Sequence, residues 1–144
     1  MSNIQIKHIS WDLNKSFNIS RGSKTTAETI EVKIESNNFY GYGECVPYKR
    51  YNETIDSVTS EINNLKPDIE EGNINLTNLD RFLKNGAARN AIDCAMWDLE
   101  CKIKNTSIWK LMGVTKPTIL PGSYTVVLDA VSYTHLRAHE TFFD

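Results

Sequence analysis

Apolar and polar residues alternate along the first third of the chain. Ile4 and Ile6 stand between polar neighbours, and a second stretch repeats this period at Ile30, Val32 and Ile34. A period of two is typical of strands that bury one face. Residues 36–38 predict a tight turn, after which residues 39–44 return antiparallel. The pattern therefore predicts a three-stranded antiparallel meander.

Residues 14–27, between the first two predicted strands, are rich in Ser, Thr, Lys and Gly. This composition is typical of an exposed loop rather than of a buried strand. The segment is long for a hairpin connection, and long ordered loops tend to carry function. We therefore expect an exposed loop with a functional role here.

After Pro47 the apolar spacing changes to that of helices. The first helical stripe consists of Ile55, Val58, Ile62 and Leu65. Asn52 is its predicted N-cap, and Pro67 is predicted to end it. A second, shorter helix is predicted from the spacing of Leu76, Leu79, Phe82 and Leu83.

The strongest helical pattern begins near Asn85. Its apolar face consists of Ala88, Ile92, Met96, Leu99 and Ile103, and alanines at 87, 91 and 95 would let a neighbour approach closely. Arg89 and Asp93 are spaced as an i,i+4 ion pair. A short turn at 107–111 is predicted next, with Gly113 placed to end it. Residues 118–128 then return to strand character.

These elements predict an α+β fold in which the meander is followed by a helical bundle. The residues expected in its core are Ile30, Val32, Ile34, Ile92, Met96 and Leu99. A chain of 144 residues is long enough for one domain with a core of its own.

Charge and composition exclude several kinds of partner. A net charge of −2 creates no basic surface for nucleic acid. The first residues lack a signal peptide's pattern, and no apolar run reaches the ~18 residues of a membrane span. We therefore expect a cytoplasmic protein that binds neither nucleic acid nor membrane. Cys45, Cys94 and Cys101 are interpreted as buried, inert thiols, because their odd count and spacing indicate neither disulfides nor zinc.

Two short motifs allow a chemical and a structural interpretation. Gly41-Tyr42-Gly43 could start a phosphate-binding loop, but a third glycine and a following helix are missing, so a β-bulge or tight bend is favoured. His135 and His139 have the spacing of two metal ligands on a helix, but no third ligand is evident. Residues 131–144 instead resemble translated sequencing-adapter read-through, which predicts a non-native tail.

Two runs of sequence carry a resemblance to a known family. Residues 86–99 read GAARNAIDCAMWDL and residues 41–48 read GYGECVPY. Together they resemble the N-terminal capping domain of the enolase superfamily. Residues 20–24 (SRGSK) and 45–51 (CVPYKRY) are most similar to its muconate-lactonizing subgroup, and there to the L-Ala-D/L-Glu (dipeptide) epimerases.

The resemblance runs from about residue 4 to residue 128 and implies a domain organisation. Residues 1–113 would form the enolase-like capping domain. Residues 114–130 would be a linker and the first strand of a (β/α)₈ barrel whose remainder is missing from this chain.

The resemblance also implies substrate-binding residues. In dipeptide epimerases a basic residue near the tip of the first loop pairs with the distal carboxylate of the substrate; Lys24 occupies the closest matching position, and Arg21 is the next candidate. Tyr48, Arg50 and Tyr51 would belong to a lid that excludes water from the reacting carbon. Thr125 would face the substrate from the first barrel strand.

In the family, the substrate's carboxylate chelates Mg²⁺, and two lysines on opposite faces remove and return the α-proton. Those lysines and the metal-binding carboxylates belong to the barrel, so the resemblance places no catalytic residue and no metal ligand in this chain. The implied function is that of a cap, which supplies specificity and closure for an isomerase acting on a small dipeptide. By itself the chain is expected to be inactive.

Other interpretations stay open. The o-succinylbenzoate synthases, cycloisomerases and N-acylamino-acid racemases share this cap. A stand-alone α+β binding module without enzymatic activity is a further alternative, and it would need its apolar helix faces covered by itself or by a partner. A homo-oligomer is left open as well.

Overall fold

The computed structural model describes residues 2–19, 22–119 and 121–122. The chain divides into two compact units, each treated by itself. The first unit, here called the body, comprises residues 2–9 and Glu28–Pro117. The second takes in the described parts of Ser10–Ala27 and Thr118–Asp144. Residues 123–144, with most of the expected barrel strand and the whole expected tail, lie outside the described part.

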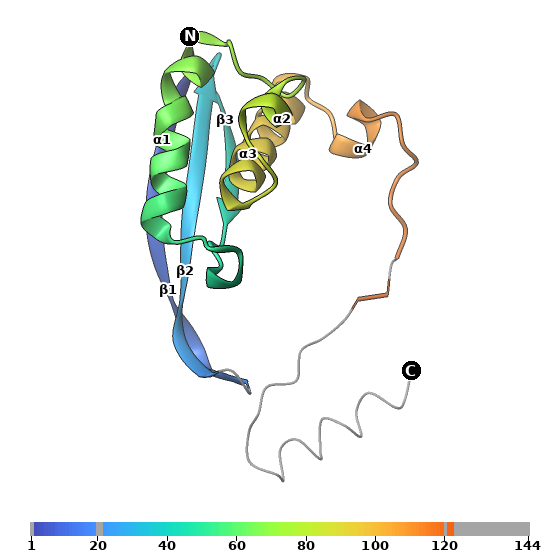
Figure 1. Cartoon of the computed structure of the whole chain (residues 1–144). Helices are drawn as coiled ribbons and strands as arrows, with labels where there is room; N and C mark the ends of the chain where they lie inside the picture. The colour runs from blue at the N-terminus through green and yellow to red at the C-terminus, as the bar shows by residue number, and fades with distance from the viewer. Residues whose placement is uncertain (1, 20–21, 120, 123–144) are drawn as a thin grey trace. The chain divides into compact units, whose positions relative to one another are not determined.

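A three-stranded antiparallel sheet begins the chain, as predicted. The strands β1 (Asn3–Ile19), β2 (Gly22–Ser36) and β3 (Phe39–Cys45) lie in that order in the sheet (Figure 1). Asn37 and Asn38 connect β2 to β3 with φ angles of 52° and 64°. Two consecutive positive φ angles are typical of the tight turns that join hairpin strands, and Asn tolerates them better than most residues.

The expected loop at residues 14–27 was wrong. Most of this segment continues β1 to Ile19 and begins β2 at Gly22. Among the described residues of Ser10–Ala27, every described side chain is exposed or half-buried. A paired ribbon satisfies its backbone groups within the ladder, so its polar side chains can stay in water on both faces. Polar composition alone therefore did not distinguish a solvated strand from a loop.

Helix α1 (Ile55–Glu71) lies against the sheet and differs from its prediction at both ends. Thr54 is the N-cap and forms a capping box with Ser57, whereas Asn52 lies in a preceding turn at φ 60°. Pro67 does not end the helix, which continues for one more turn. That turn buries Ile69, and burial of such a side chain contributes ~1.5–3 kcal/mol, comparable to the ~3 kcal/mol cost of an interior proline.

Three further helices follow: α2 (Leu79–Phe82), α3 (Ala87–Ile103) and α4 (Ile108–Leu111). Leu79 and Leu83 are buried as predicted, but Phe82 is exposed. Gly113 follows α4 with φ 69°, the left-handed conformation that favours glycine at a helix end. Among the described residues, no helix is both long enough and apolar enough to cross a membrane.

The core lies between the sheet and the helices, and all six residues expected there are buried. Its closest contact joins α3 to β3. A Cβ atom at Gly41 would lie 2.0 Å from the carbonyl oxygen of Ala95, and one at Gly43 would lie 2.0 Å from that of Ala91. The two glycines therefore let the helix backbone rest directly on the strand.

This contact corrects the interpretation of Gly41-Tyr42-Gly43 as a bulge or bend. The β2–β3 register runs without a slip from Ile30↔Cys45 to Ser36↔Phe39, and Val32 and Ile34 face the two glycines. The strand is regular, and the missing side chains serve the helix that crosses it.

Polar side chains of α3 also bind the outer edge of β3. The contacts are Asn90 Nδ2 to Glu44 O at 3.1 Å, Tyr42 N to Asp98 Oδ2 at 2.8 Å and Lys102 Nζ to Tyr40 O at 2.8 Å. On the opposite edge, Lys66 and Glu70 of α1 bind the backbone oxygen and nitrogen of Ile4. Open strand edges invite pairing with other chains, and here helix side chains occupy part of both.

Arg89 does not form the expected ion pair with Asp93 among the contacts of the body. Its Nη1 donates a hydrogen bond to Oδ1 of Asn85 at 2.8 Å instead. Asn85 precedes the helix, so the arginine folds back toward the helix start rather than forward along its face.

Candidate functional site

The segment between β3 and α1, residues 46–53, is here called the aromatic loop. At its centre the 3₁₀ turn η1 (Lys49–Tyr51) is closed by Tyr51 N donating to Tyr48 O at 2.8 Å and by Asn52 N donating to Lys49 O at 3.0 Å. The rings of Tyr48 and Tyr51 lie 6.0 Å apart, between centroids, and are tilted by 48°. Tyr48 is 40% exposed and Tyr51 70% exposed, so this pair presents aromatic surface to solvent.

Glu53 connects this loop to the start of α3. Its Oε2 accepts a hydrogen bond from the backbone N–H of Tyr48 at 3.2 Å, and its Oε1 accepts one from the backbone N–H of Ala87 at 2.7 Å. Gly86, the N-cap of α3, offers no side chain to cap the helix. The carboxylate therefore caps α3 from a loop 34 residues away in sequence.

The aromatic loop and the helix start enclose a hollow of about 450 Å³. Its lining combines the two tyrosine rings with amide and carboxylate groups, contributed in part by Tyr48, Tyr51, Glu53, Asn85 and Asn90. A small polar molecule with an apolar part would fit this mixture of groups.

Cys45 lies at the base of this hollow and does not serve as a nucleophile. Burial, followed by the nearby charges of Glu53 and Glu44, raises the pKa of the Cys45 thiol to about 11. A thiol with so high a pKa stays protonated at neutral pH and reacts slowly. The expectation of buried, inert thiols therefore holds for Cys45.

The burial expected for the other two cysteines was wrong. Cys94 is exposed and Cys101 is half-buried on α3, and all three thiols are free. The helix presents its alanine and isoleucine face to the core, which leaves the cysteine positions on its outer side.

The predicted substrate-binding residues fall into three groups. Tyr48, Arg50 and Tyr51 lie together in the aromatic loop of the body, and all three are exposed. Lys24 belongs to the second unit, where it is an exposed residue of β2 rather than of a loop. Arg21 and Thr125 lie outside the described residues, as do His135 and His139.

Sequence analysis missed Glu53. An acidic residue just before a helical stripe is common, and nothing in the local sequence links it to Ala87. The available signal was indirect: α3 begins after a glycine and lacks a capping side chain of its own, so its first N–H groups needed a partner from elsewhere.

The described residues contain no group of three or more His, Cys, Asp or Glu side chains that could hold a metal ion. Several carboxylates are instead paired with lysines of the same helix, as in Asp98–Lys102 and Glu100–Lys104, both at 2.6 Å. This part of the chain thus offers no fitting site for a divalent cation.

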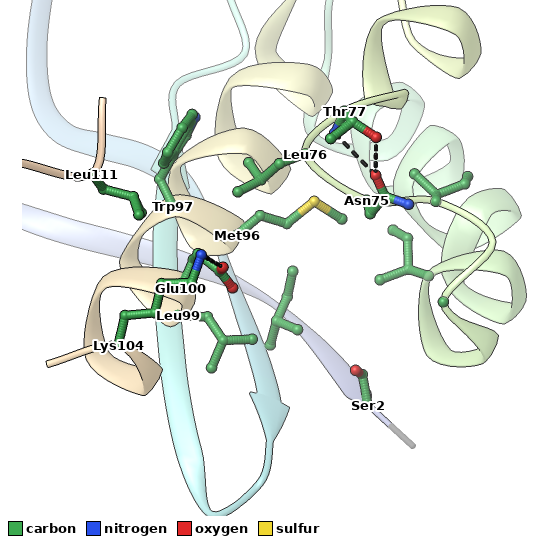
Figure 2. A pocket seen from close by; sticks show the side chains of 14 residues that line it. Ser2, Asn75, Leu76, Thr77, Met96, Trp97, Leu99, Glu100, Lys104 and Leu111 are labelled. Atoms are coloured by element: carbon green, nitrogen blue, oxygen red, sulfur yellow. Dashed lines mark hydrogen bonds and ion pairs between the residues drawn. The ribbon is translucent and has the colours of Figure 1, made fainter. Parts of the chain in front are cut away.

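A second hollow, of about 500 Å³, lies on the body beside α3 (Figure 2). Leu76, Met96 and Leu99 give it an apolar floor, and the Glu100–Lys104 pair stands at its rim. Asn75 and Thr77 bond to each other there, with Thr77 Oγ1 2.6 Å from Asn75 Oδ1. Asn75, Thr77, Glu100 and Lys104 are thus partnered with one another in pairs.

The described fold is thus a three-stranded meander with helix α3 packed on two strand glycines and with the aromatic loop between β3 and α1. The family described as "Mandelate racemase / muconate lactonizing enzyme, N-terminal domain" matches residues 1–113. The chain belongs to this family.

Individual relatives agree with that assignment. The chain is 38% identical over 128 residues to the L-Ala-D/L-Glu epimerase of Escherichia coli (strain K12). The matching region makes up 89% of this chain and 40% of the relative. It is 41% identical over 90 residues to an N-acetyl-D-glutamate racemase of a Pseudoalteromonas species, covering 62% of this chain and 29% of the relative.

One solved structure is similar over nearly the whole chain. It is an enolase family member from Agrobacterium tumefaciens with homology to dipeptide epimerases, with bound sodium, L-Ala-L-Glu and an ordered loop; it matches at 34% identity and a TM-score of 0.85, over 97% of this chain and 43% of that one. The chain thus spans about two fifths of the length of such relatives.

Proposed function

We propose that this chain is the capping domain of a dipeptide epimerase that inverts the α-carbon of the glutamate residue in an Ala-Glu dipeptide. The observation that carries the proposal is the 38% identity to an L-Ala-D/L-Glu epimerase over 89% of this chain. The role of the cap would be to select the substrate and to close over it.

In this proposal the aromatic loop acts as a lid. Tyr48 and Tyr51 present exposed rings next to a hollow of about 450 Å³, and Arg50, which lies between them in the sequence, adds an exposed positive charge to the loop. Aromatic rings that cover a reacting carbon exclude water, and a nearby cation favours an anionic substrate.

The distal carboxylate of the glutamate would be bound by Lys24 or Arg21. Lys24 is exposed in its own unit, as a residue that meets a substrate must be. Thr125 would contact the substrate from the first barrel strand. The accompanying domain organisation is a cap at residues 1–113, a linker and first barrel strand at 114–130, and a non-native tail at 131–144.

The chemistry itself is proposed to occur in a downstream barrel that this chain does not contain. Mg²⁺ bound there would stabilise the negative charge that develops when the α-proton leaves. The described residues of this chain do not fit such an ion, so they would bind, orient and enclose the substrate without moving its proton.

An N-acylamino-acid racemase is a second candidate, favoured by the 41% identity to an N-acetyl-D-glutamate racemase. L-Ala-L-Glu and N-acetylglutamate are both glutamates whose amino group carries an acyl substituent. A cap that recognises the side-chain carboxylate would therefore suit either substrate, and the two candidates differ only at the acyl end.

The deciding experiment uses a longer protein, in which the capping domain is followed by the barrel sequence read from the genomic locus. The protein is incubated with Mg²⁺ in deuterated water, with L-Ala-L-Glu in one sample and N-acetyl-L-glutamate in another, while NMR follows the α-proton of glutamate. Faster exchange with the dipeptide supports the epimerase, and faster exchange with the acetylated amino acid supports the racemase. Exchange with neither substrate contradicts both.

A further inference from the structure

The aromatic loop has few regular backbone contacts to hold it. The β2–β3 ladder ends at Cys45, and α1 begins after Thr54. Within the loop, the backbone bonds of Tyr51, Asn52 and Glu53 all reach back to Tyr48 or Lys49. These bonds shape the turn internally, but they do not connect it to the rest of the body. A turn of this kind opens locally at low cost unless a side chain anchors it.

Glu53 supplies an anchor with two ends. One carboxylate oxygen binds the N–H of Tyr48, and the other binds the N–H of Ala87 at the short distance of 2.7 Å. Charge-assisted hydrogen bonds of this kind are stronger than neutral ones, and a negative charge is favoured at the first turn of a helix. Helix α3 is packed against the strand glycines through Ala91 and Ala95, so the anchor point belongs to a helix held in the core.

Gly86, which has no side chain, leaves room for the carboxylate of Glu53. A Cβ atom at Gly86 would lie 2.9 Å from Oε1 of Glu53, closer than such atoms normally approach. The φ angle of Gly86 is 170°, an extended conformation that any residue adopts. The absence of a side chain at this position therefore serves the carboxylate rather than the backbone.

We propose that Glu53 is the positioning residue of the lid: by tying the backbone of Tyr48 to the first turn of α3, it sets where the rings of Tyr48 and Tyr51 stand when a substrate is enclosed. The part that concerns substrate rests on the proposed function, in which the aromatic loop closes over an N-acylated glutamate. Glu53 itself does not contact the reacting atoms, so its removal should weaken binding more than it slows chemistry.

The anchoring is tested first on the present chain, with Glu53→Gln and Gly86→Ala. Glutamine cannot accept both hydrogen bonds, because one of its two terminal atoms is a donor. Alanine at position 86 keeps the charge but pushes the carboxylate away. Glu61→Gln, a matched charge change on the exposed face of α1, serves as the control. Lys49 and Arg50 give trypsin two cleavage sites within the loop itself.

Both test variants should be cleaved after Lys49 and Arg50 about fivefold to tenfold faster than the wild type, because losing one solvent-exposed hydrogen bond favours the open loop by roughly this factor. Cleavage after Lys110, on α4, should not change, and Glu61→Gln should behave as the wild type. Hydrogen exchange at the Tyr48 amide should rise in parallel. If Glu53→Gln unfolds, Glu53→Asp decides instead, because its side chain keeps the charge but is one methylene too short to reach both N–H groups. Unchanged cleavage and exchange in a folded variant overturn the anchor.

The substrate part is tested in the protein that carries the restored barrel. Glu53→Gln should raise KM about fivefold to tenfold and leave kcat within about threefold. A KM equal to the wild-type value, in an enzyme that turns its substrate over, overturns the positioning role even if cleavage accelerates. If the restored protein exchanges neither substrate, the proposed function fails, while the cleavage rates still decide whether Glu53 anchors the loop.

Discussion

The contact between α3 and β3 and the contact between α3 and the aromatic loop use the same helix in opposite ways. On β3, Gly41 and Gly43 lie against the backbone carbonyls of Ala95 and Ala91, which are about one helical turn apart. At the loop, one carboxylate spans the gap with two hydrogen bonds. The first contact is made of many small attractions without space to adjust. The second contact includes a flexible side chain, the Glu53 carboxylate, which reaches both the loop and the start of the helix.

This difference is the one a capping domain needs. A domain that selects a substrate needs a frame that holds its position and a segment that moves over the ligand. The body supplies the frame through its glycine and alanine interface. In the proposed function the aromatic loop would be the segment that closes, and it carries the exposed side chains of Tyr48, Arg50 and Tyr51.

The largest change in stability is expected from adding a side chain at the contact between α3 and β3. Gly43→Ala would place a Cβ atom 2.0 Å from the carbonyl oxygen of Ala91, and two backbones cannot separate without disrupting the core. We expect a loss of about 3 kcal/mol or more in the free energy of unfolding. Chemical denaturation measures it, with Gly122→Ala, where a Cβ atom meets nothing within 4 Å, as the control. Equal stability of both variants would contradict the close packing of helix on strand.

The next effect concerns substrate rather than stability, and it is measured in the protein with its barrel restored. Lys24→Met and Arg21→Met should each be tested, because Lys24 is the first and Arg21 the second candidate for the proposed contact with the distal carboxylate. The variant that removes the true partner should lower kcat/KM for L-Ala-L-Glu about tenfold to hundredfold, from the loss of one charged contact.

The selectivity of that loss provides its control. An Ala-Leu dipeptide lacks the distal carboxylate, so its kcat/KM should not change in either variant. Lys15→Met makes the same change on β1 and should leave both substrates unaffected. If both test variants retain the wild-type preference for glutamate over leucine, the specificity for the acidic side chain lies elsewhere in the protein.

A pH effect of intermediate size is expected from Cys45 in the body. Its pKa is raised from 9.0 to about 11 in the folded state, so the folded protein holds its proton where the unfolded chain releases it. Stability is therefore full below pH 9 and falls as the pH rises toward 11, by at most about 2 kcal/mol between pH 8 and pH 10.5.

Other groups titrate over the same range, so the informative quantity is the difference between the wild type and Cys45→Ala. The variant has no thiol to titrate at this position, so its unfolding free energy should fall less steeply as the pH rises. Parallel pH profiles would show that the Cys45 thiol titrates alike in both states.

The smallest effect is expected at the edge of β3. Asp98→Asn weakens the contact to the Tyr42 N–H and removes the charge that pairs with Lys102. These groups are partly exposed, so we expect a loss of about 1 kcal/mol by thermal or chemical unfolding. Asp93→Asn on the same helix should change stability by less than about 0.5 kcal/mol. A larger loss at Asp93 than at Asp98 would contradict the edge contact.

The sequence by itself determined the elements whose physical cause is local. The period of two at Ile30, Val32 and Ile34 predicted the central strand, and the two asparagines at 37 and 38 predicted the turn, because alternation and turn conformations are properties of neighbouring residues. The apolar face of α3 was predicted for the same reason. The family resemblance, carried by short runs such as residues 41–48, was confirmed as well.

Only the tertiary structure decided the features that depend on partners distant in sequence. Gly41 and Gly43 are small because α3 crosses them, α1 continues past Pro67 because Ile69 reaches the core, and Glu53 matters because Ala87 lies beside it. No window of the sequence contains both partners of these contacts. Local patterns therefore predicted which elements form, whereas packing between them decided where they end and which polar residue holds the loop.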